Sequence, residues 1–291
     1  MRILLIGLGQ LGRCLAAILP LYGQLTIWDR ATVDLRLPER LAQLLDQLKP
    51  NIIFNAAAYT RIDAAEQETK LAMAINGQSP AVLAAWAKAN GASFVHYSTD
   101  YVFDGRKLAS YVEEDPPNPL NVYGRSKWAG DEAILKTGGH CYIFRTSWLY
   151  GTLGRNFPKT ILSLAKTKLT LEVVDNQIGA PTSAEFLALA SAQAVFGAKP
   201  AYGLYHLTAS NSVSWHGLAC YLVEKAQRWE PDLKLKPENI TPVKSLKDYP
   251  AARPANSVLS NQKFFQTFGL RSPSWDYYMD RFLVEYFERF K

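Results

Sequence analysis

A phenol and an amine four residues apart, Tyr123 and Lys127, form the pattern in this 291-residue chain best suited to chemistry. If their segment is helical, the spacing places both side chains on one face, about 6 Å apart along the axis. A tyrosine has a pKa near ~10, and a neighbouring positive charge favours its phenolate and brings the group closer to working pH. The pair therefore predicts a proton donor to a carbonyl under reduction. A surface contact between a tyrosine and a lysine is the simpler alternative, because chance matches to this spacing are common.

Three polar residues precede this pair. Ser98, Thr99 and Asp100 directly follow an apolar run over residues 92–97, which has the pattern of a strand. Ligands of open α/β sheets bind at the carboxyl ends of strands, so these side chains are candidates for substrate contacts. A proline-rich loop over residues 113–119 then leads into the helix expected to carry Tyr123.

The N-terminus has the pattern of a nucleotide-binding turn. Gly7, Gly9 and Gly12 stand between a short apolar run and a stretch with helical periodicity. Glycines let the backbone approach a pyrophosphate, and the helix N-terminus offers it free N–H groups. A second apolar run ends at Asp29, about 20 residues beyond Gly9, where a partner for a ribose 2′-hydroxyl is expected. Together these features predict dinucleotide binding rather than only a tight turn.

The two residues after the second strand leave the choice of cofactor open. The carboxylate of Asp29 favours NADH, because it repels a 2′-phosphate. The adjacent Arg30 could instead bind that phosphate. The expected cofactor is therefore NADPH or NADH.

The order of elements predicts the fold class. Strands and helices alternate up to about residue 150, which predicts an α/β protein with a doubly wound parallel sheet of the Rossmann type. We expect residues 1–150 to form the dinucleotide-binding domain. Residues 151–291 are less regular and are expected to form a smaller, interleaved part that mainly binds substrate, with segments that return to the first domain.

The composition is that of an ordinary globular protein, with 48% hydrophobic and 20% charged residues. The net charge of +6 suits a polyanionic ligand such as a sugar nucleotide or a dinucleotide, and it is equally compatible with a mildly basic surface that has no ligand. No basic run exceeds two residues and no zinc or RNA-binding signature is present, so no nucleic-acid partner is expected.

The cysteines and histidines show no metal-binding pattern. The three cysteines, Cys14, Cys141 and Cys220, are odd in number and far apart, which predicts reduced thiols in a cytoplasmic protein. We expect most of the four histidines to be structural. No apolar run approaches the ~18 residues that a membrane span needs, and the short apolar N-terminus fits a strand rather than a signal peptide.

Seven short motifs along the chain resemble those of the extended short-chain dehydrogenase/reductases, and within them the dTDP-4-dehydrorhamnose reductase family. Two are common to the superfamily, namely GQLG at 9–12 and YGRSK at 123–127. The others are NAAAYT at 55–60, STDYVFDG at 98–105, RTSWLYG at 145–151, DNQIGAPT at 175–182 and RPANS at 253–257. STDYVF, RTSW-x-Y and RP-x-NS together are the more specific to this family.

The resemblance implies a role for each matching residue. Tyr123 is expected to be the proton donor, Lys127 to hold the nicotinamide ribose and lower the pKa of Tyr123, and Thr99 to position the ketone. The remaining positions expected to contact the cofactor, from the motif and the resemblance, are Gly7, Gly9, Gln10, Leu11, Gly12, Asp29, Arg30, Asp34, Leu35, Ala57, Ala58, Tyr59 and Tyr97. Substrate contacts are expected from Thr99, Asp100, Trp148, Arg253 and Asn256. For Trp148, Tyr59 and Tyr97, ordinary packing is the alternative.

The implied activity is the NAD(P)H-dependent reduction of the carbon-4 ketone of a dTDP-4-keto-6-deoxy sugar, which makes dTDP-L-rhamnose. A sugar-nucleotide epimerase or dehydratase on the same fold is one alternative, although Tyr101 stands where dehydratases usually carry a glutamate. A non-catalytic regulatory subunit is another, against which the complete set of Tyr123, Lys127 and Thr99 argues.

The chain departs from the family pattern in one place, and two properties stay open. Its first two glycines are one residue closer than in the usual G-x-x-G-x-x-G, which predicts a tighter loop. Some relatives bind magnesium, but no carboxylate cluster supports a metal here. The oligomeric state is expected to be monomer or homodimer.

Overall fold

Six parallel strands form the central sheet of the computed structural model, which describes residues 1–244 and 250–289. The strand order is β10-β5-β4-β3-β1-β2, and every neighbouring pair is parallel. The strands span Arg2–Ile6 (β1), Gln24–Trp28 (β2), Ile52–Asn55 (β3), Ser93–Thr99 (β4), Cys141–Thr146 (β5) and Gly203–His206 (β10). Runs such as RILLI are apolar on both faces because both faces of a parallel sheet are covered.

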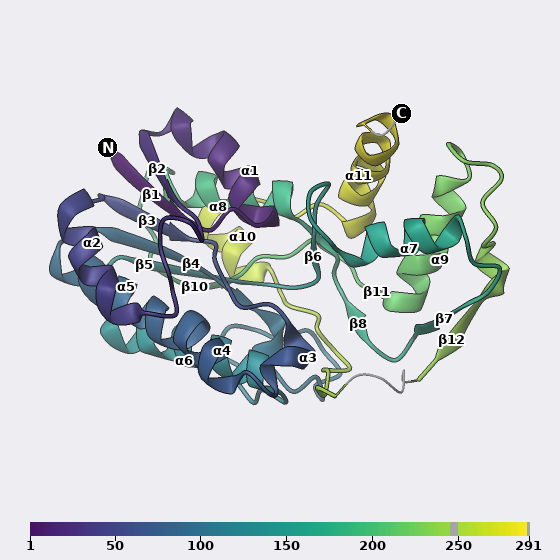
Figure 1. Cartoon of the computed structure of the whole chain (residues 1–291), viewed down its shortest axis with the longest axis horizontal. Helices are drawn as coiled ribbons and strands as arrows, with labels where there is room; N and C mark the ends of the chain where they lie inside the picture. Colours follow the sequence, from purple (N-terminus) through teal and green to yellow (C-terminus); the bar gives the residue numbers. More distant parts are fainter. Residues whose placement is uncertain (245–249, 290–291) are drawn as a thin grey trace.

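Helices cover the sheet on both sides, so the prediction of a doubly wound α/β fold is confirmed (Figure 1). Helices α1 (Gln10–Ile18), α8 (Ala184–Val195) and α10 (Gln262–Phe268) pack on one face. Helices α2 (Leu41–Leu48), α5 (Ser79–Ala89) and α6 (Val122–Thr137) pack on the other.

The chain reverses its direction of winding between β1 and β3. From β1 it goes first to β2 at the edge and then back to β3 on the other side. Ligands of open α/β sheets bind outside the carboxyl ends of the strands at such a switch point. Gly7 directly follows β1 and begins the glycine segment over residues 7–12. Ala56 directly follows β3 and begins the alanine segment over residues 56–58, so two small-residue segments meet this switch point.

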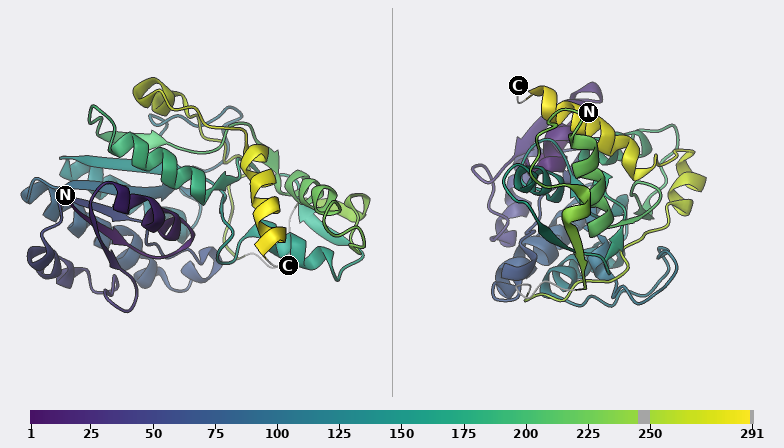
Figure 2. Two further views of the ribbon diagram at one scale, coloured as in Figure 1. Left: turned by 90° about the horizontal axis from the view of Figure 1, so that it is seen from above. Right: turned by 90° about the vertical axis from the view of Figure 1, so that its right-hand side faces the viewer.

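A smaller part lies beside this domain, seen most clearly in Figure 2. It has its own apolar core, built mainly from α7 (Phe157–Ala165), α9 (Trp215–Ala226) and α11 (Trp275–Arg289). Strand β7 (Leu171–Val174) pairs in parallel with β12 (Ile240–Val243) at its outer side. Two further pairs of short strands are β6 (Leu149–Tyr150) with β9 (Thr182–Ser183), and β8 (Ile178–Gly179) with β11 (Val213–Ser214).

The two parts are interleaved in sequence. Helix α8 and strand β10 lie beyond residue 150, yet both belong to the first domain. Helix α8 packs on α1, and β10 completes the edge of the central sheet. Helix α11 joins the parts, because its Met279 is buried in the smaller core while its Tyr278 packs on Phe186 of α8.

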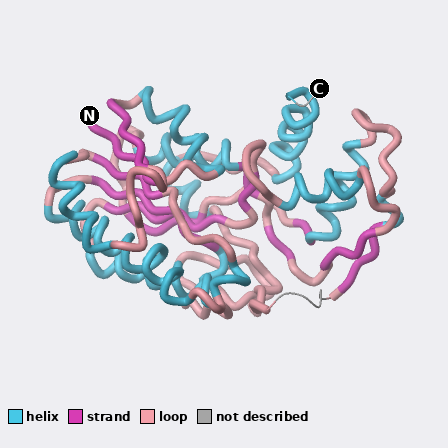
Figure 3. The backbone as a smooth tube through the Cα atoms, viewed as in Figure 1, coloured by secondary structure: helices cyan, strands magenta, loops and turns pink. Residues whose placement is uncertain are grey.

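Several elements differ from the expected pattern (Figure 3). The sequence predicts a helix over residues 64–90 with a break near Asn76-Gly77 and Ser79-Pro80. The structure has α3 (Ile62–Ala65), α4 (Thr69–Met73), a π-helical turn (Ala74–Gln78) where the break is expected, and α5. The loop expected over residues 175–182 contains β8 and the start of β9. Sequence reasoning missed β12, in which only Ile240 is buried, and the short helix α10, whose Phe264 is buried against the sheet. The C-terminal helix was expected to reach Phe290, which lies outside the described residues.

No helix within residues 1–244 and 250–289 has the length and apolar character needed to cross a membrane.

Candidate active site

Helix α6 carries Tyr123 and Lys127, as the sequence predicts, and its start is fixed by polar contacts. The side chain of Asn121 accepts a hydrogen bond from the N–H of Gly124 at 2.8 Å and so caps the helix. The N–H of Val122 donates to Glu66 at 2.7 Å. Because Tyr123 lies in the first turn, these contacts fix the position of its backbone.

A glycine allows this first turn to lie against the end of β4. A Cβ on Gly124 would stand 2.2 Å from the carbonyl oxygen of Tyr101, so a larger residue would push the helix away. Tyr101 belongs to a short 3-10 turn, Asp100–Val102, which directly follows β4. The close approach brings the Tyr123 phenol beside Thr99, close enough for the Thr99 hydroxyl to act on its pKa.

The surroundings of Tyr123 act on its pKa in a direction the sequence did not predict. Burial raises the pKa of the phenol, and the Thr99 hydrogen bond lowers it by less. The nearby carboxylates of Asp100 and Asp131 raise it further. The loss of hydration therefore outweighs the groups that favour the phenolate, and the phenol keeps its proton firmly.

Lys127 is almost completely enclosed, with 2% of its surface exposed. Its Nζ donates to the carbonyl oxygen of Tyr97 at 2.6 Å and lies 3.3 Å from Nε2 of His96. Burial lowers the pKa of Lys127 to about 8, and the negative charge of Asp131 opposes that shift. The amine can therefore gain or lose a proton near neutral pH.

Sequence reasoning missed a buried polar group behind Lys127. Asp131 lies one helical turn beyond Lys127, and its Oδ2 accepts hydrogen bonds from Arg145 Nε at 3.0 Å and Ser98 Oγ at 2.8 Å. Asp131 and Arg145 are both buried, and the guanidinium also lies over the rings of Phe103 and Trp128. The four-residue spacing from Lys127 to Asp131 was the available signal.

The acidic residue after Thr99 is also enclosed. Asp100 is 2% exposed, and its Oδ1 accepts from the Thr99 hydroxyl at 3.1 Å. Burial raises the pKa of Asp100 to about 6, and hydrogen bonds from Ser257 and Thr99 oppose the shift. Its Oδ2 has no hydrogen-bond partner among the described residues, so this oxygen can accept from a ligand. Ser257 was missed, although it ends the RPANS motif.

Trp148 follows β5 at the same sheet edge in a left-handed backbone conformation, with φ of 48°. Its ring stacks on Trp215 at 3.5 Å between centroids, and Gly179 lies so close that a Cβ there would stand 2.5 Å from the ring. A non-glycine residue in this conformation is held by its surroundings and is a feature of functional sites. Trp148 is half-buried, so packing and a face open to ligand coexist.

Arg253 and Asn256, from the late loop, reach the first domain. Arg253 forms an ion pair with Asp63, with Nη2 2.7 Å from Oδ2. Nδ2 of Asn256 donates to the carbonyl oxygens of Lys107 and Ala109. These contacts tie the late loop to Asp63 and to residues 107–109.

The glycine loop after β1 has the geometry expected of a phosphate-binding turn. Gly7 has φ of +94°, and a Cβ there would stand 2.8 Å from the backbone of Ala57, which brings the two small-residue segments into contact. A Cβ on Gly9 would meet nothing within 4 Å. Gly9 precedes α1 without a side-chain cap, so no side chain of the N-cap residue occupies the N–H groups of the first turn, and these suit an anion. Gln10 accepts from Asn156 at 2.8 Å, and Leu11 and Gly12 are buried.

Asp29 directly follows β2, and its side chain binds the backbone of the turn that it begins. Its Oδ1 accepts from the N–H groups of Ala31 and Thr32 and from the Thr32 hydroxyl. The Thr32 hydrogen bond is the main reason that the pKa of Asp29 is lowered. The carboxylate is thus held beside Arg30, whose exposed side chain lines a surface hollow of about 620 Å³.

The other predicted cofactor residues differ in their contacts and burial. Asp34 is joined to Arg36 through both carboxylate oxygens, and Leu35 is buried beneath. Ala57 and Ala58 lie at the end of β3, near the glycine loop. The Tyr59 phenol donates to Glu68, and that of Tyr97 pairs with Ser191 in the core. Tyr97 therefore presents its carbonyl oxygen, rather than its phenol, to Lys127.

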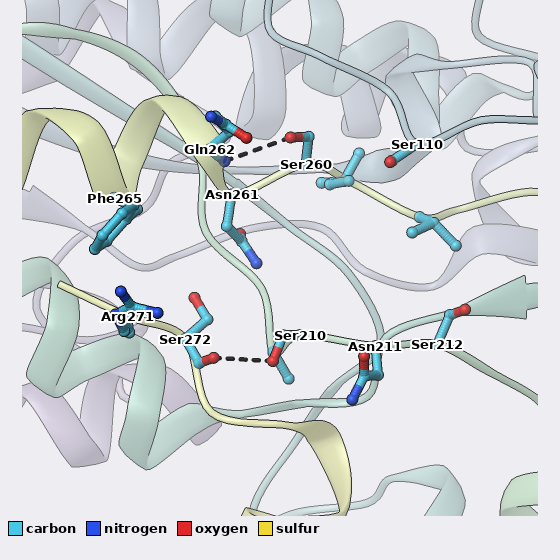
Figure 4. Close-up of a pocket in the computed structure, with 13 residues that line it drawn as sticks. Ser110, Ser210, Asn211, Ser212, Ser260, Asn261, Gln262, Phe265, Arg271 and Ser272 are labelled. Atoms are coloured by element: carbon cyan, nitrogen blue, oxygen red, sulfur yellow. Dashed lines mark hydrogen bonds between the residues drawn. The ribbon is translucent and has the colours of Figure 1, made fainter.

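A second hollow, of about 490 Å³, lies away from these residues and contains none of them (Figure 4). Serine and amide side chains dominate its lining, with Ser210 bonded to Ser272 and Gln262 to Ser260. Across residues 1–244 and 250–289, no group of three or more histidine, cysteine, aspartate or glutamate side chains could hold a metal ion. All three cysteines are free.

Comparisons with known proteins by sequence and by structure both find relatives named dTDP-4-dehydrorhamnose reductase. Residues 1–287 match the family described as RmlD substrate binding domain. The dTDP-4-dehydrorhamnose reductase of Burkholderia thailandensis is 42% identical over 286 residues, covering 95% of this chain and 96% of that protein. The enzyme of the same name from Salmonella typhimurium is 42% identical over 295 residues, covering 99% and 98%.

The same name appears among solved structures. The crystal structure of dTDP-4-dehydrorhamnose reductase from Bacillus anthracis in complex with NADP has a TM-score of 0.88 and 34% identity, and the match covers 98% of each chain. The resemblance found in the sequence motifs is therefore confirmed. The chain belongs to the RmlD substrate binding domain family, together with these dTDP-4-dehydrorhamnose reductases.

Proposed function

We propose that this protein is an NAD(P)H-dependent dTDP-4-dehydrorhamnose reductase, which reduces the carbon-4 ketone of a dTDP-4-keto-6-deoxy sugar and makes dTDP-L-rhamnose. One observation carries the proposal: the Tyr123 phenol lies beside Thr99, close enough for that hydroxyl to act on its pKa, and one helical turn from the buried amine of Lys127. A hydroxyl, a phenol and an amine at the carboxyl edge of a parallel sheet have the chemistry needed to protonate a developing alkoxide.

The chain has a place for a dinucleotide. The open space at Gly9, the uncapped first turn of α1 and the contact between Gly7 and Ala57 fit a pyrophosphate near the switch point. The residues proposed to hold it are Gly7, Gly9, Gln10, Leu11 and Gly12, with Ala57, Ala58, Tyr59 and the backbone of Tyr97 further along the same edge. When bound, the reduced nicotinamide supplies the hydride for the ketone carbon.

Three side chains act on the ketone oxygen in this proposal. Tyr123 donates its proton at Oη as negative charge builds, and Thr99 donates a second hydrogen bond to the same oxygen. A preorganised donor of this kind lowers an activation barrier by roughly 2.7–4 kcal/mol in other enzymes. Lys127, in its ammonium form, places positive charge beside the phenolate that results and so limits the free energy needed to form it.

The substrate contacts are proposed on the opposite side from the glycine loop. Asp100 offers its unpartnered Oδ2 to a sugar hydroxyl, and Trp148 offers the exposed part of its ring. Arg253 and Asn256 fix the loop that closes over this side. We propose that residues 1–150 bind the dinucleotide and that residues 151–291 mainly bind the sugar nucleotide.

Two further proposals concern the whole molecule. A cytoplasmic location is favoured by three cysteines that form no disulfide, and cell fractionation tests it. A monomer or homodimer is proposed for the oligomeric state, and analytical ultracentrifugation distinguishes the two.

The activity is tested by following cofactor oxidation at 340 nm with dTDP-4-keto-6-deoxy sugars, using NADPH and NADH in separate runs. Stoichiometric oxidation that depends on the ketone is expected. Cofactor that copurifies and is never consumed would point to an epimerase instead. An absence of ketone-dependent turnover, together with copurification of an unrelated enzyme, would point to a regulatory subunit.

A further inference from the structure

The amine of Lys127 contacts a histidine that belongs to none of the motifs. His96 lies on β4 and is completely buried, and its side chain points to the same face of the sheet as Ser98, toward α6. Its Nε2 is 3.3 Å from Nζ of Lys127, and its Nδ1 is 3.2 Å from Nδ2 of Asn55 at the end of β3. The imidazole therefore bridges β3 to α6.

The partners of Asn55 determine which ring nitrogen of His96 carries the proton. Oδ1 of Asn55 accepts from the N–H of Ala57 at 3.3 Å, which leaves the amide nitrogen facing His96. An amide nitrogen only donates, so Nδ1 must accept with its lone pair. Burial and the charge of Lys127 lower the pKa of His96 well below its ordinary value. The ring is therefore neutral, and its single proton is on Nε2.

A carboxylate supports the same assignment. Oδ1 of Asp131 lies 4.0 Å from Nε2 of His96 and has no hydrogen-bond partner in the described part of the chain. Its negative charge favours a proton on the near side of the ring. The Nε2–H group thus lies beside both Asp131 and Nζ of Lys127.

We propose that His96 is a positioning residue of the reaction: held by Asn55, it donates its Nε2–H to Nζ of Lys127 when the amine is neutral, and so sets the pH at which Lys127 loses the ammonium charge that assists Tyr123. With Tyr97 accepting from the same nitrogen, two hydrogen bonds from β4 determine where the amine lies. The inference rests on the proposed function, because it assigns His96 to the step in which Lys127 assists Tyr123.

This contact also affects how readily Lys127 loses a proton. A neutral amine can accept from Nε2–H, whereas an ammonium has no lone pair, so His96 favours the neutral amine. The other charged and titratable groups around the amine are Tyr123 and Asp131 from α6, Asp100 from the turn after β4, and Arg145 from β5. Asp131 favours the ammonium, but one of its oxygens is bound to Arg145 and Ser98.

The tautomer can be measured in the wild-type protein without any turnover. ¹⁵N NMR of histidine-labelled, full-length protein distinguishes the two neutral tautomers and the imidazolium by their ring nitrogen shifts, and the His96→Phe variant identifies the signal. At pH 7 the neutral Nε2–H form is expected. A neutral Nδ1–H form, or an imidazolium, would overturn the proposal.

The kinetic test compares two buried histidines. His96→Phe retains a ring beside Phe94 but has no donor for Lys127. We expect the alkaline limb of the pH–rate profile to move up by about one unit, because the neutral amine loses a hydrogen bond, while kcat and KM below that limb change little. His206→Phe is the matched control: His206 is equally buried, on β10, and binds the carbonyl oxygen of Tyr111 rather than Lys127. Its alkaline limb should stay where it is in the wild type.

An alkaline limb that stays in place or moves to lower pH in His96→Phe would contradict the proposal. If that variant does not fold, Asn55→Leu keeps the imidazole and removes the group that orients it, and its limb should move in the same direction. Wild-type protein that fails to oxidise NADPH with the keto sugar would instead contradict the proposed function, whatever tautomer the NMR spectrum shows.

Discussion

The Tyr123 phenol lies beside the Thr99 hydroxyl, although Thr99 ends a strand and Tyr123 stands in the first turn of a helix. The contact depends on the close packing at Gly124, which lets α6 touch the turn after β4. It defines the point at which a ketone oxygen can receive two hydrogen bonds at once.

Tyr123→Phe removes the proton donor and leaves the ring. We expect turnover to fall by about 10²–10⁴-fold, the usual contribution of a positioned acid, while the affinity for NADPH stays close to that of the wild type. Steady-state kinetics and a fluorescence titration with NADPH measure the two quantities. Tyr142→Phe, a change at a distant strand position, is the control. A Tyr123→Phe variant that turns over normally would remove Tyr123 from the mechanism.

Thr99→Val replaces the hydroxyl with a methyl group of similar size. The loss of one donor to the ketone oxygen should lower kcat by about 10²–10³-fold. Thr99→Ser, which keeps the hydroxyl, should retain most of the activity. Equal losses in the two variants would show that the shape of the side chain, and not its hydrogen bond, is what the site requires.

The pH dependence follows from two buried groups. The pKa of Lys127 is lowered to about 8, so kcat/KM should fall as pH rises through that value and the amine loses its positive charge. The pKa of Asp100 is raised to about 6, so an acid limb is expected as this carboxylate becomes protonated below that pH. In Asp100→Asn the acid limb should disappear while the alkaline limb remains, and its persistence would assign that limb to another group.

Asp131→Asn breaks a buried ion pair and leaves Arg145 without its carboxylate. Removing one partner of such a pair costs about 3–5 kcal/mol, and urea unfolding followed by circular dichroism measures that loss. Glu132→Gln, at the next position of the same helix, is the matched control, because the Glu132–Lys136 pair is exposed. That change should cost no more than about 0.5 kcal/mol. Similar losses in both variants would mean that burial does not govern the effect.

Arg30→Ala tests which cofactor the end of β2 selects. Asp29 is occupied by its own turn, whereas the exposed side chain of Arg30 can reach a 2′-phosphate. The KM for NADPH should rise about 10-fold, the value of one charge-assisted hydrogen bond, and the KM for NADH should not change. An equal rise for both cofactors would show that Arg30 does not discriminate between them.

The sequence was sufficient where local spacing determines geometry. The four-residue spacing of Tyr123 and Lys127, the glycines after β1 and the apolar runs of the parallel strands each gave the correct element. Asn121 and Gly124 at the start of α6 show why: capping and close approach depend on residues next to the element itself. The family resemblance added Thr99, which the structure places beside the Tyr123 phenol.

The features that could not be predicted from the sequence depend on contacts between distant residues and on burial. Arg253 binds Asp63, which is 190 positions away, and no spacing rule links them. His96 looked like one more structural histidine, because its contact with Lys127 arises only when α6 packs on β4. The pKa of Tyr123 was expected to be lowered by Lys127, but desolvation, which no motif reveals, raises it.

The edge strand β10 joins the central sheet only after the chain has passed through α7, β7 and α8. Its pairing with β5 closes a loop of more than fifty residues, and long loops of this kind slow folding because their ends must meet before the contact stabilises anything. A nascent chain that has emerged only as far as residue 150 therefore exposes the unpaired edge of β5. The sheet and the smaller part should form in one cooperative event, late in synthesis, rather than as two independent units.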